Sequence, residues 1–275
     1  IACNHEGGIM MDGVLMRPND EEFIYVQANG DFLNWAQAHI GELDVSIFDF
    51  DSWVLQVQGP TSLDVLESVS GISVEEFPYY AVTETDINGT SFYVSRSGWT
   101  GERGFEIYSK NAEFDGVALW NFLLDRGKAS GLIGSDVSSM HIRRIEAGIL
   151  DYGTDIDQTL NPFEIGLDRL IHFDKSNFIG REALLTTNQK KIRLKGLICD
   201  GSSLTRGDRL IDSGKEIGIV SAGSWSPTLG TGIGLIRLLN SKPDDYKLKV
   251  ATSSGEFDAK VVELPFYDKE KLLTK

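Results

Sequence analysis

The segment Ser97–Ile107 constrains the fold more than any other part of the chain. It predicts a strand, a tight turn and a second strand, and three of its first eight residues are glycine. Glycine permits turn conformations and close backbone approach that other residues resist. A plain hairpin needs only polar turn residues, whereas this turn carries Trp99 and is followed by the carboxylate of Glu106. The segment therefore predicts β-structure that presents functional groups.

A second unusual segment lies at the end of a helix predicted over residues 135–147. It has the sequence Arg144-Ile145-Glu146-Ala147-Gly148 and runs on to Tyr152-Gly153. Two small residues beside a charged pair permit close approach of the backbone to another group. On the residues alone, Arg144 could also be a surface helix residue and Glu106 an exposed strand carboxylate.

Together these segments resemble the folate-binding core of the aminomethyltransferase family, which contains the T-protein of the glycine cleavage system and several tetrahydrofolate-dependent demethylases. The family pattern Gly-aromatic-Thr-Gly-Glu-x-Gly-aromatic-Glu matches residues 98–106. The resemblance implies that tetrahydrofolate is the cofactor and that Glu106 accepts hydrogen bonds from the 2-amino and N3–H groups of its pterin. It also implies that Arg144 reaches the pterin carbonyl. The other cofactor-binding residues expected are Trp99, Tyr152 and Gln27.

The segment Gly7-Gly8-Ile9-Met10-Met11-Asp12 departs from the T-protein pattern Gly-Gly-x-x-Asp-Asp at the first acid. The resemblance implies that the remaining acid, Asp12, is catalytic and orients N5 of tetrahydrofolate. Without the resemblance, Asp12 is a turn aspartate after a strand. Methionine at position 11 weakens the specific claim of glycine cleavage chemistry.

These departures favour a demethylase. Residues 25–31 and 161–167 are closer to the demethylase branch, and the first segment resembles enzymes that use dimethylsulfoniopropionate. We therefore expect a tetrahydrofolate-dependent methyltransferase that demethylates a small-molecule S-, N- or O-methyl donor and gives 5-methyltetrahydrofolate. The alternative is the T-protein reaction, in which an aminomethyl group comes from a lipoyl carrier protein and ammonia is released. A second alternative is a non-catalytic folate-binding accessory protein, and a third is a domain of a larger flavin dehydrogenase.

The resemblance implies an α+β fold, a three-lobed cloverleaf of two α/β folate-binding lobes and a C-terminal antiparallel β-barrel. The expected lobes are residues 1–47 with 129–188, a ferredoxin-like lobe over 48–128, and the barrel over 189–275. The order β-α-β-β-β-α predicts the ferredoxin-like lobe, and five apolar runs after residue 191 predict the barrel or a sandwich. The other elements expected are a helix over 31–40, strands over 45–50 and 53–57, a helix over 61–69 capped by Thr61-Ser62, a hairpin turning at Asn88-Gly89, and a helix over 113–128 with Val117 inward.

Composition restricts the partners and the compartment. A net charge of −15 argues against nucleic acid and against an anionic membrane surface. No apolar run approaches the roughly 20 residues that span a bilayer, and no signal peptide is visible. Two distant cysteines and four histidines without ligand spacing predict a cytoplasmic protein with no metal site. The family normally has a stretch before the Gly-Gly motif, so we expect that Ile1 is not the native start.

Overall fold

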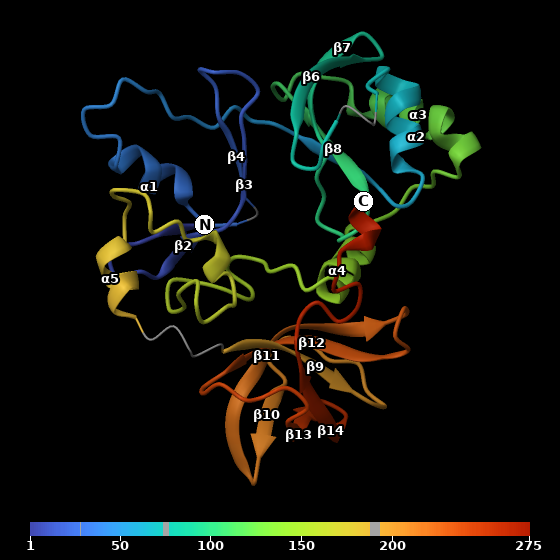
Figure 1. The fold of residues 1–275 in the computed structure, drawn as a ribbon. Helices are drawn as coiled ribbons and strands as arrows, with labels where there is room; N and C mark the ends of the chain where they lie inside the picture. The colour runs from blue at the N-terminus through green and yellow to red at the C-terminus, as the bar shows by residue number, and fades with distance from the viewer. Residues whose placement is uncertain (28, 74–76, 188–192) are drawn as a thin grey trace. The chain divides into compact units, whose positions relative to one another are not determined.

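The computed structural model describes residues 1–27, 29–73, 77–187 and 193–275. The chain forms two compact units whose segments alternate along the sequence (Figure 1). The barrel unit contains Ile1–Gly13, Gln27–Gly30 and His141–Lys269, and the sheet unit contains Val14–Val26, Asp31–Met140 and Glu270–Lys275. The residue ranges of the three lobes expected from the sequence remain a prediction.

The sheet unit is built on a four-stranded antiparallel sheet with the order β5-β8-β7-β6. Its strands are β5 (Val54–Gln58), β6 (Val82–Ile87), β7 (Thr90–Ser95) and β8 (Gly104–Ser109). Helices α2 (Ser62–Ser70) and α3 (Gly116–Gly127) pack apolar side chains against one face of the sheet (Figure 1). Because side chains alternate along a strand, Phe105 and Ile107 enter this core and Glu106 points to the other face.

The strand order differs from the split β-α-β arrangement expected of a ferredoxin-like lobe. Strands β6, β7 and β8 follow one another as a meander, and β5 pairs with β8. All three pairings are antiparallel, so β5 and β6 lie at opposite edges and run in opposite directions. The meander has a local cause: β6 and β7 are joined by the predicted turn, in which Asn88 has φ 55° and Gly89 φ 80°, as a type I′ turn requires.

A hairpin of β3 (Val14–Met16) and β4 (Ile24–Val26) packs on the same face of the sheet as Glu106. Met16 and Ile24 form a small core there with Tyr93 and Tyr108. The hydroxyl of Tyr93 donates to the carboxylate of Glu22 across 2.9 Å, which links this sheet face to the segment between β3 and β4.

Two sequence expectations in the sheet unit are corrected. Helix α1 (Phe32–Ala38) forms within the predicted range, and none of its residues is buried. Residues 45–50 form no strand, because no strand of the described chain pairs with this segment. Phe48, one of its apolar side chains, is 70% exposed. Val117 lies in the first turn of α3 and is 72% exposed. The unit also contains the short helices η2 (Lys128–Ser130) and η4 (Leu272–Thr274).

Helix α2 also begins differently from the expectation. It follows Thr61 as predicted, but the Thr61 side chain makes no capping hydrogen bond. Its hydroxyl instead donates to the carbonyl of Ser130 across 2.8 Å. The side chain therefore links the start of α2 to η2.

The barrel unit contains a closed six-stranded barrel with the order β10-β11-β12-β9-β14-β13. All five predicted runs form strands, and β10 is an addition that closes the barrel by pairing with β11 and β13. Prediction missed β10 because it has four residues, of which only Leu210 is buried. The strands are β9 (Leu194–Cys199), β10 (Arg209–Asp212), β11 (Lys215–Ser226), β12 (Thr231–Leu238), β13 (Lys247–Thr252) and β14 (Gly255–Val262).

The rest of the barrel unit packs around β2 (Ile9–Met11), which pairs with β1 (Ala2–Cys3). Ile9 of β2 shares a core with Ile145 and with Ile233 of the barrel. Ile145 belongs to α4 (Val137–Glu146), which begins in the sheet unit and ends in this one. This core fixes the end of β2, and Asp12 is the next residue after that strand. The remaining elements are η3 (Asp168–Leu170) and α5 (Arg181–Thr186).

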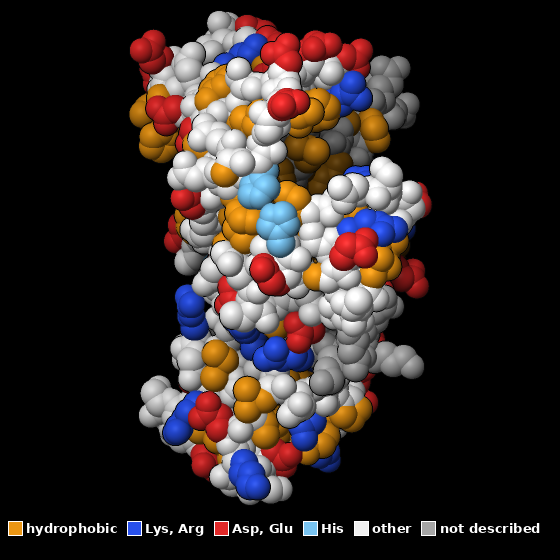
Figure 2. All heavy atoms as spheres, turned by 90° about the vertical axis from the view of Figure 1, so that its left-hand side faces the viewer, with side chains coloured by type: hydrophobic (Ala, Val, Ile, Leu, Met, Phe, Trp, Pro, Cys, Tyr) orange, Lys and Arg blue, Asp and Glu red, His pale blue; other side chains and the backbone are white. Residues whose placement is uncertain are grey.

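None of the helices in the described part of the chain is long and apolar enough to cross a lipid bilayer. Figure 2 shows acidic and basic side chains interspersed over one face of the molecule. The cytoplasmic compartment remains a prediction.

Candidate functional site

Glu106 is a buried carboxylate on β8, and its side chain is held in one orientation. Its exposure is 8%. One oxygen, Oε2, accepts hydrogen bonds from the hydroxyls of Ser97, across 2.5 Å, and Tyr108, across 2.8 Å. None of the described residues donates to the other oxygen, Oε1. The carboxylate is therefore fixed by its protein neighbours and retains acceptor capacity on one oxygen.

The surroundings of Glu106 keep its hydroxyl partners protonated. Burial, and next the charge of Glu106, raise the pKa of Tyr108 well above its ordinary value. The pKa of Tyr79 is also raised, by burial, by Tyr80 and by the charge of Glu106, while Arg96 acts in the opposite direction. Tyr79 and Arg96 are thus neighbours of the site that sequence analysis did not identify.

The glycines of the turn before Glu106 make room for a side chain. A Cβ atom on Gly98 would lie 2.1 Å from Gln58, and one on Gly104 would lie 2.4 Å from it. The Gln58 carboxamide donates to the carbonyls of Ser97 and Phe105 and accepts from the hydroxyl of Thr100. Close approach, rather than positive φ, therefore explains two of the three glycines. No local pattern in the sequence predicts that the Gln58 side chain packs against these glycines.

Trp99 lies in the same turn and is half-buried. A contact between Trp99 and folate remains a prediction.

Asp12 follows β2 and is only partly exposed. Burial raises the pKa of its carboxyl to about 6, and the carboxylates of Asp151 and Asp155 act in the same direction. A carboxyl with such a pKa can change protonation state near neutral pH. Asp12 is therefore chemically suited to the catalytic role that the sequence predicts.

Met11, at the position of the absent first acid, belongs to the core. Its side chain is fully buried. Gly30 adopts φ +98°, and a Cβ there would lie 2.6 Å from the methyl group of Met11 and 3.0 Å from the ring of Tyr152. Tyr152 is partly buried against the core that contains Ile9 and Ile145. The amide of Gln27, another predicted cofactor-binding residue, donates to the carbonyl of Gly30 across 3.1 Å.

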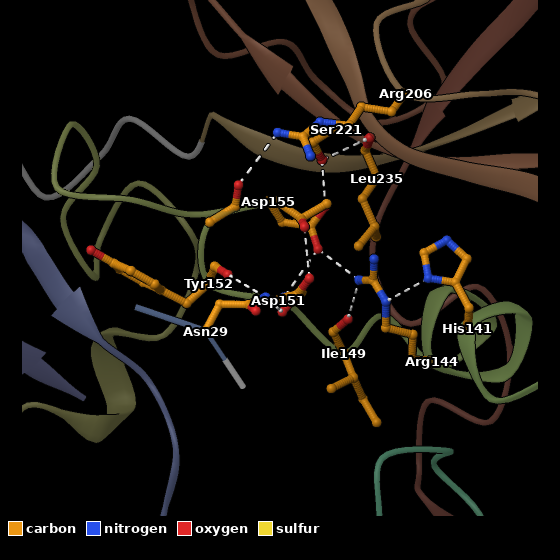
Figure 3. A network of polar contacts seen from close by, with 12 residues as sticks. Asn29, His141, Arg144, Ile149, Asp151, Tyr152, Asp155, Arg206, Ser221 and Leu235 are labelled. Atoms are coloured by element: carbon orange, nitrogen blue, oxygen red, sulfur yellow. Dashed lines mark hydrogen bonds and ion pairs between the residues drawn. The ribbon is translucent and has the colours of Figure 1, made fainter. Parts of the chain in front are cut away.

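Arg144 forms a buried ion pair instead of facing solvent (Figure 3). Its Nη1 donates to Asp155 across 2.7 Å and to the carbonyl of Ile149 across 3.1 Å. The carboxylate of Asp155 also accepts from the hydroxyl of Ser221 on β11. Asp151, whose backbone N–H donates to Asp155, lies between this pair and Asn29 (Figure 3). These contacts give Arg144 a structural role, and its contact with a pterin remains a prediction.

The six predicted site residues fall into two sets. Trp99 and Glu106 belong to the sheet unit. The remaining four, Asp12, Gln27, Arg144 and Tyr152, belong to the barrel unit. Within the sheet unit, the buried and oriented carboxylate of Glu106 fits the neighbouring N–H donors of a pterin, because Oε1 can accept from one or two of them.

Comparison with known proteins identifies the family. The family model of the GCVT N-terminal domain matches residues 1–175, and that of the glycine cleavage T-protein C-terminal barrel domain matches residues 193–268. The chain is 31% identical to the aminomethyltransferase of Halothermothrix orenii over 274 residues, which are 96% of this chain and 76% of that protein. It is 35% identical to the aminomethyltransferase of Thermotoga petrophila over 280 residues, 97% of this chain and 75% of that protein.

A solved structure has the same fold. It is described as the glycine cleavage system aminomethyltransferase T from Bartonella henselae, and it aligns with a TM-score of 0.85 at 23% identity. The alignment covers 99% of this chain and 76% of that one. On the two family models and the relatives above 30% identity, this chain belongs to the glycine cleavage T-protein family of aminomethyltransferases.

Proposed function

We propose that this chain transfers an aminomethyl group from a lipoyl carrier protein to tetrahydrofolate with release of ammonia. The family uses tetrahydrofolate, and the chain is a transferase of that family. The names of its relatives favour aminomethyl transfer, the alternative considered from the sequence, over demethylation of a methyl donor.

The observation that carries the proposal is the state of Glu106. Hydroxyl donors hold one oxygen of this buried carboxylate, and the described residues leave the other without a donor. Oε1 of Glu106 is not among the described polar atoms that are closed to solvent without a partner, so a ligand or water can reach it and supply a donor. The pterin of tetrahydrofolate offers such donors, which supports folate binding at this position.

The buried position of Met11 removes much of the sequence argument against aminomethyl transfer. That argument counted the methionine as a missing acid. Position 11 packs against Gly30 inside the barrel unit. A carboxylate there would be desolvated and expensive to ionise. Asp12, with its pKa near 6, is the acid of this segment that can exchange a proton.

The proposed roles follow from these contacts. Tetrahydrofolate, when bound, would supply two amine nitrogens that bond to the transferred carbon while its bonds to the carrier sulfur and to the amino group break, so that the carrier thiol and ammonia leave. Glu106 holds the pterin through Oε1, and Ser97 and Tyr108 keep that carboxylate in place. The departing amine needs a proton to leave as ammonia. The Asp12 carboxyl, with a pKa of about 6, is protonated in roughly a tenth of molecules at neutral pH and can supply it.

The test is ammonia release by the purified chain mixed with tetrahydrofolate and a lipoylated carrier protein that bears an aminomethyl group. We expect ammonia only when all three are present. A panel of sulfonium, quaternary ammonium and aryl ether donors serves as the comparison. Absence of ammonia together with 5-methyltetrahydrofolate from one of these donors would replace the proposal with the demethylase hypothesis.

A further inference from the structure

Gln56 lies beside Glu106 on the same face of the sheet. The two residues are directly paired between strands β5 and β8. Directly opposed residues of an antiparallel pair project to the same side, with Cβ atoms about 4.5–5.5 Å apart. The neighbouring residue Val57 enters the core under α2 and α3, which places Gln56 on the opposite face, with Glu106.

Gln56 is half-buried, and the oxygen of its carboxamide is closed to solvent without a hydrogen-bond partner. Its Oε1 has no solvent-accessible surface and accepts no hydrogen bond from the described part of the chain. Most buried side-chain polar atoms in native proteins are hydrogen-bonded, so each exception requires a reason. Gln58, two residues along the same strand, shows the contrast because its carboxamide makes hydrogen bonds through both Oε1 and Nε2.

Two acceptor oxygens therefore lie on adjacent strands without protein donors: Oε1 of Gln56 and Oε1 of Glu106. Oε1 of Gln56 is closed to solvent and lacks a donor. Its position beside Oε1 of Glu106, on paired residues of one sheet face, points to a ligand that brings several N–H donors to that face.

We infer that Gln56 is a second pterin-contacting residue that acts beside Glu106. This inference rests on the proposed function, because it takes tetrahydrofolate as the ligand. The 2-amino group of a pterin has two hydrogens, and Glu106 requires only the one on the N3–H side. The other lies next to ring atom N1, which is an acceptor. A carboxamide complements that pair, since its oxygen accepts from the amino group while its nitrogen donates to N1.

The test compares the substitution Gln56→Met with wild type. Methionine keeps the length of the side chain and removes both polar atoms. We expect the affinity for tetrahydrofolate, measured by calorimetry, to fall about 2- to 150-fold, the range of one to two neutral hydrogen bonds. The Tm of the ligand-free protein should stay the same or rise, because an unsatisfied buried acceptor has been removed. Gln56→Ala is the second variant if the methionine does not fit.

Two control variants come from the same strand and the same face. Gln58→Met should lower the Tm of the ligand-free protein, because it removes the hydrogen bonds of Gln58 to Ser97 and Thr100. Val54→Ala changes an exposed side chain, at 52% exposure, and should leave folate affinity unchanged.

The outcomes separate this inference from the proposed function. If Gln56 donates to Glu106 in the ligand-free protein, its role is structural. Gln56→Met would then lower the Tm as Gln58→Met does, and the inference would be overturned. Unchanged affinity in Gln56→Met, combined with weakened affinity in Glu106→Gln, would also overturn it while leaving folate binding intact. Failure of the wild-type chain to bind tetrahydrofolate would reject both.

Discussion

Arg144 and Asp155 form an ion pair that is closed to solvent on both sides. Nη1 of the arginine lies 2.7 Å from Oδ2 of the aspartate, and neither side chain is exposed. Oδ1 of Asp155 accepts from Ser221 on β11 of the barrel across 2.6 Å. The pair therefore joins the end of α4 to the barrel and fixes the loop that carries Asp151 and Tyr152.

Breaking this pair on one side should strongly destabilise the barrel unit. Arg144→Met leaves the Asp155 carboxylate buried without its cation, and Asp155→Leu leaves the guanidinium without its anion. Each should lower the free energy of unfolding by about 3–5 kcal/mol in urea denaturation. The double variant, which removes both charges, should recover part of the loss. Single variants with the stability of wild type would show that the pair does not form.

Glu106→Gln should weaken folate binding without unfolding the sheet unit. Glutamine keeps the shape but replaces one acceptor oxygen with a donor, which then faces either the hydroxyls or the pterin. An unpaired buried donor costs about 1–3 kcal/mol, which corresponds to roughly 5- to 150-fold in affinity. Calorimetry with tetrahydrofolate measures the change. Glu84→Gln, at an exposed glutamate on β6, is the matched control and should bind normally. Normal binding by Glu106→Gln would remove this residue from the site.

Asp12→Asn should change how stability depends on pH. The pKa of Asp12 is raised from 3.8 to about 6 in the folded state, so folding favours the protonated carboxyl. The folded state therefore loses stability relative to the unfolded state as pH rises through this window, because the carboxyl must ionise. Asparagine removes the loss, and the Tm of the variant relative to wild type should rise between about pH 4 and pH 6.

The variant should gain about 1 kcal/mol of stability relative to wild type, once the raised pKa is discounted for the partial exposure of Asp12. This gain corresponds to roughly 2–4 °C in Tm. Asp258→Asn, at an exposed aspartate on β14, is the control and should show no such pH-dependent gain. A constant Tm difference for Asp12→Asn across the window would mean that Asp12 is not buried as described.

Met11→Asp should destabilise the protein instead of restoring a catalytic acid. The side chain at position 11 is fully buried against Gly30. An aspartate there would lose apolar packing and bury a polar group without an evident partner, a change of about 2–5 kcal/mol. Met11→Leu keeps the volume and should change stability by less than about 1.5 kcal/mol. A stable Met11→Asp variant with faster ammonia release would instead place position 11 in the active site.

Local patterns in the sequence predict much of this fold. Short apolar runs identify five of the barrel strands, and Asn88-Gly89 marks the turn between β6 and β7 because it favours the positive φ values found there. The apolar run over residues 45–50 predicts a strand that does not form, since a strand also requires a partner. The absence of a partner strand depends on the tertiary fold, which local patterns in a single sequence do not indicate.

The candidate site likewise has features that the sequence predicts and features that it does not. The motif around Glu106 is local, so its strand and Gly-rich turn could be predicted. The pairing of Gln56 with Glu106 and the insertion of Gln58 between two glycines depend on strand register. The burial of Arg144 depends on Asp155 and Ser221, and Ser221 is remote in sequence. Contacts between residues far apart in the sequence cannot be recognised from the spacing of residues in a motif.

The most direct test of aminomethyl transfer follows the transferred carbon itself. A lipoylated carrier protein loaded with an isotopically labelled aminomethyl group is mixed with the chain and tetrahydrofolate, and the folate products are separated by mass spectrometry. We predict label in 5,10-methylenetetrahydrofolate, with ammonia released in equal amount. Unlabelled folate from this mixture, together with 5-methyltetrahydrofolate from a methyl donor offered in parallel, would contradict the account.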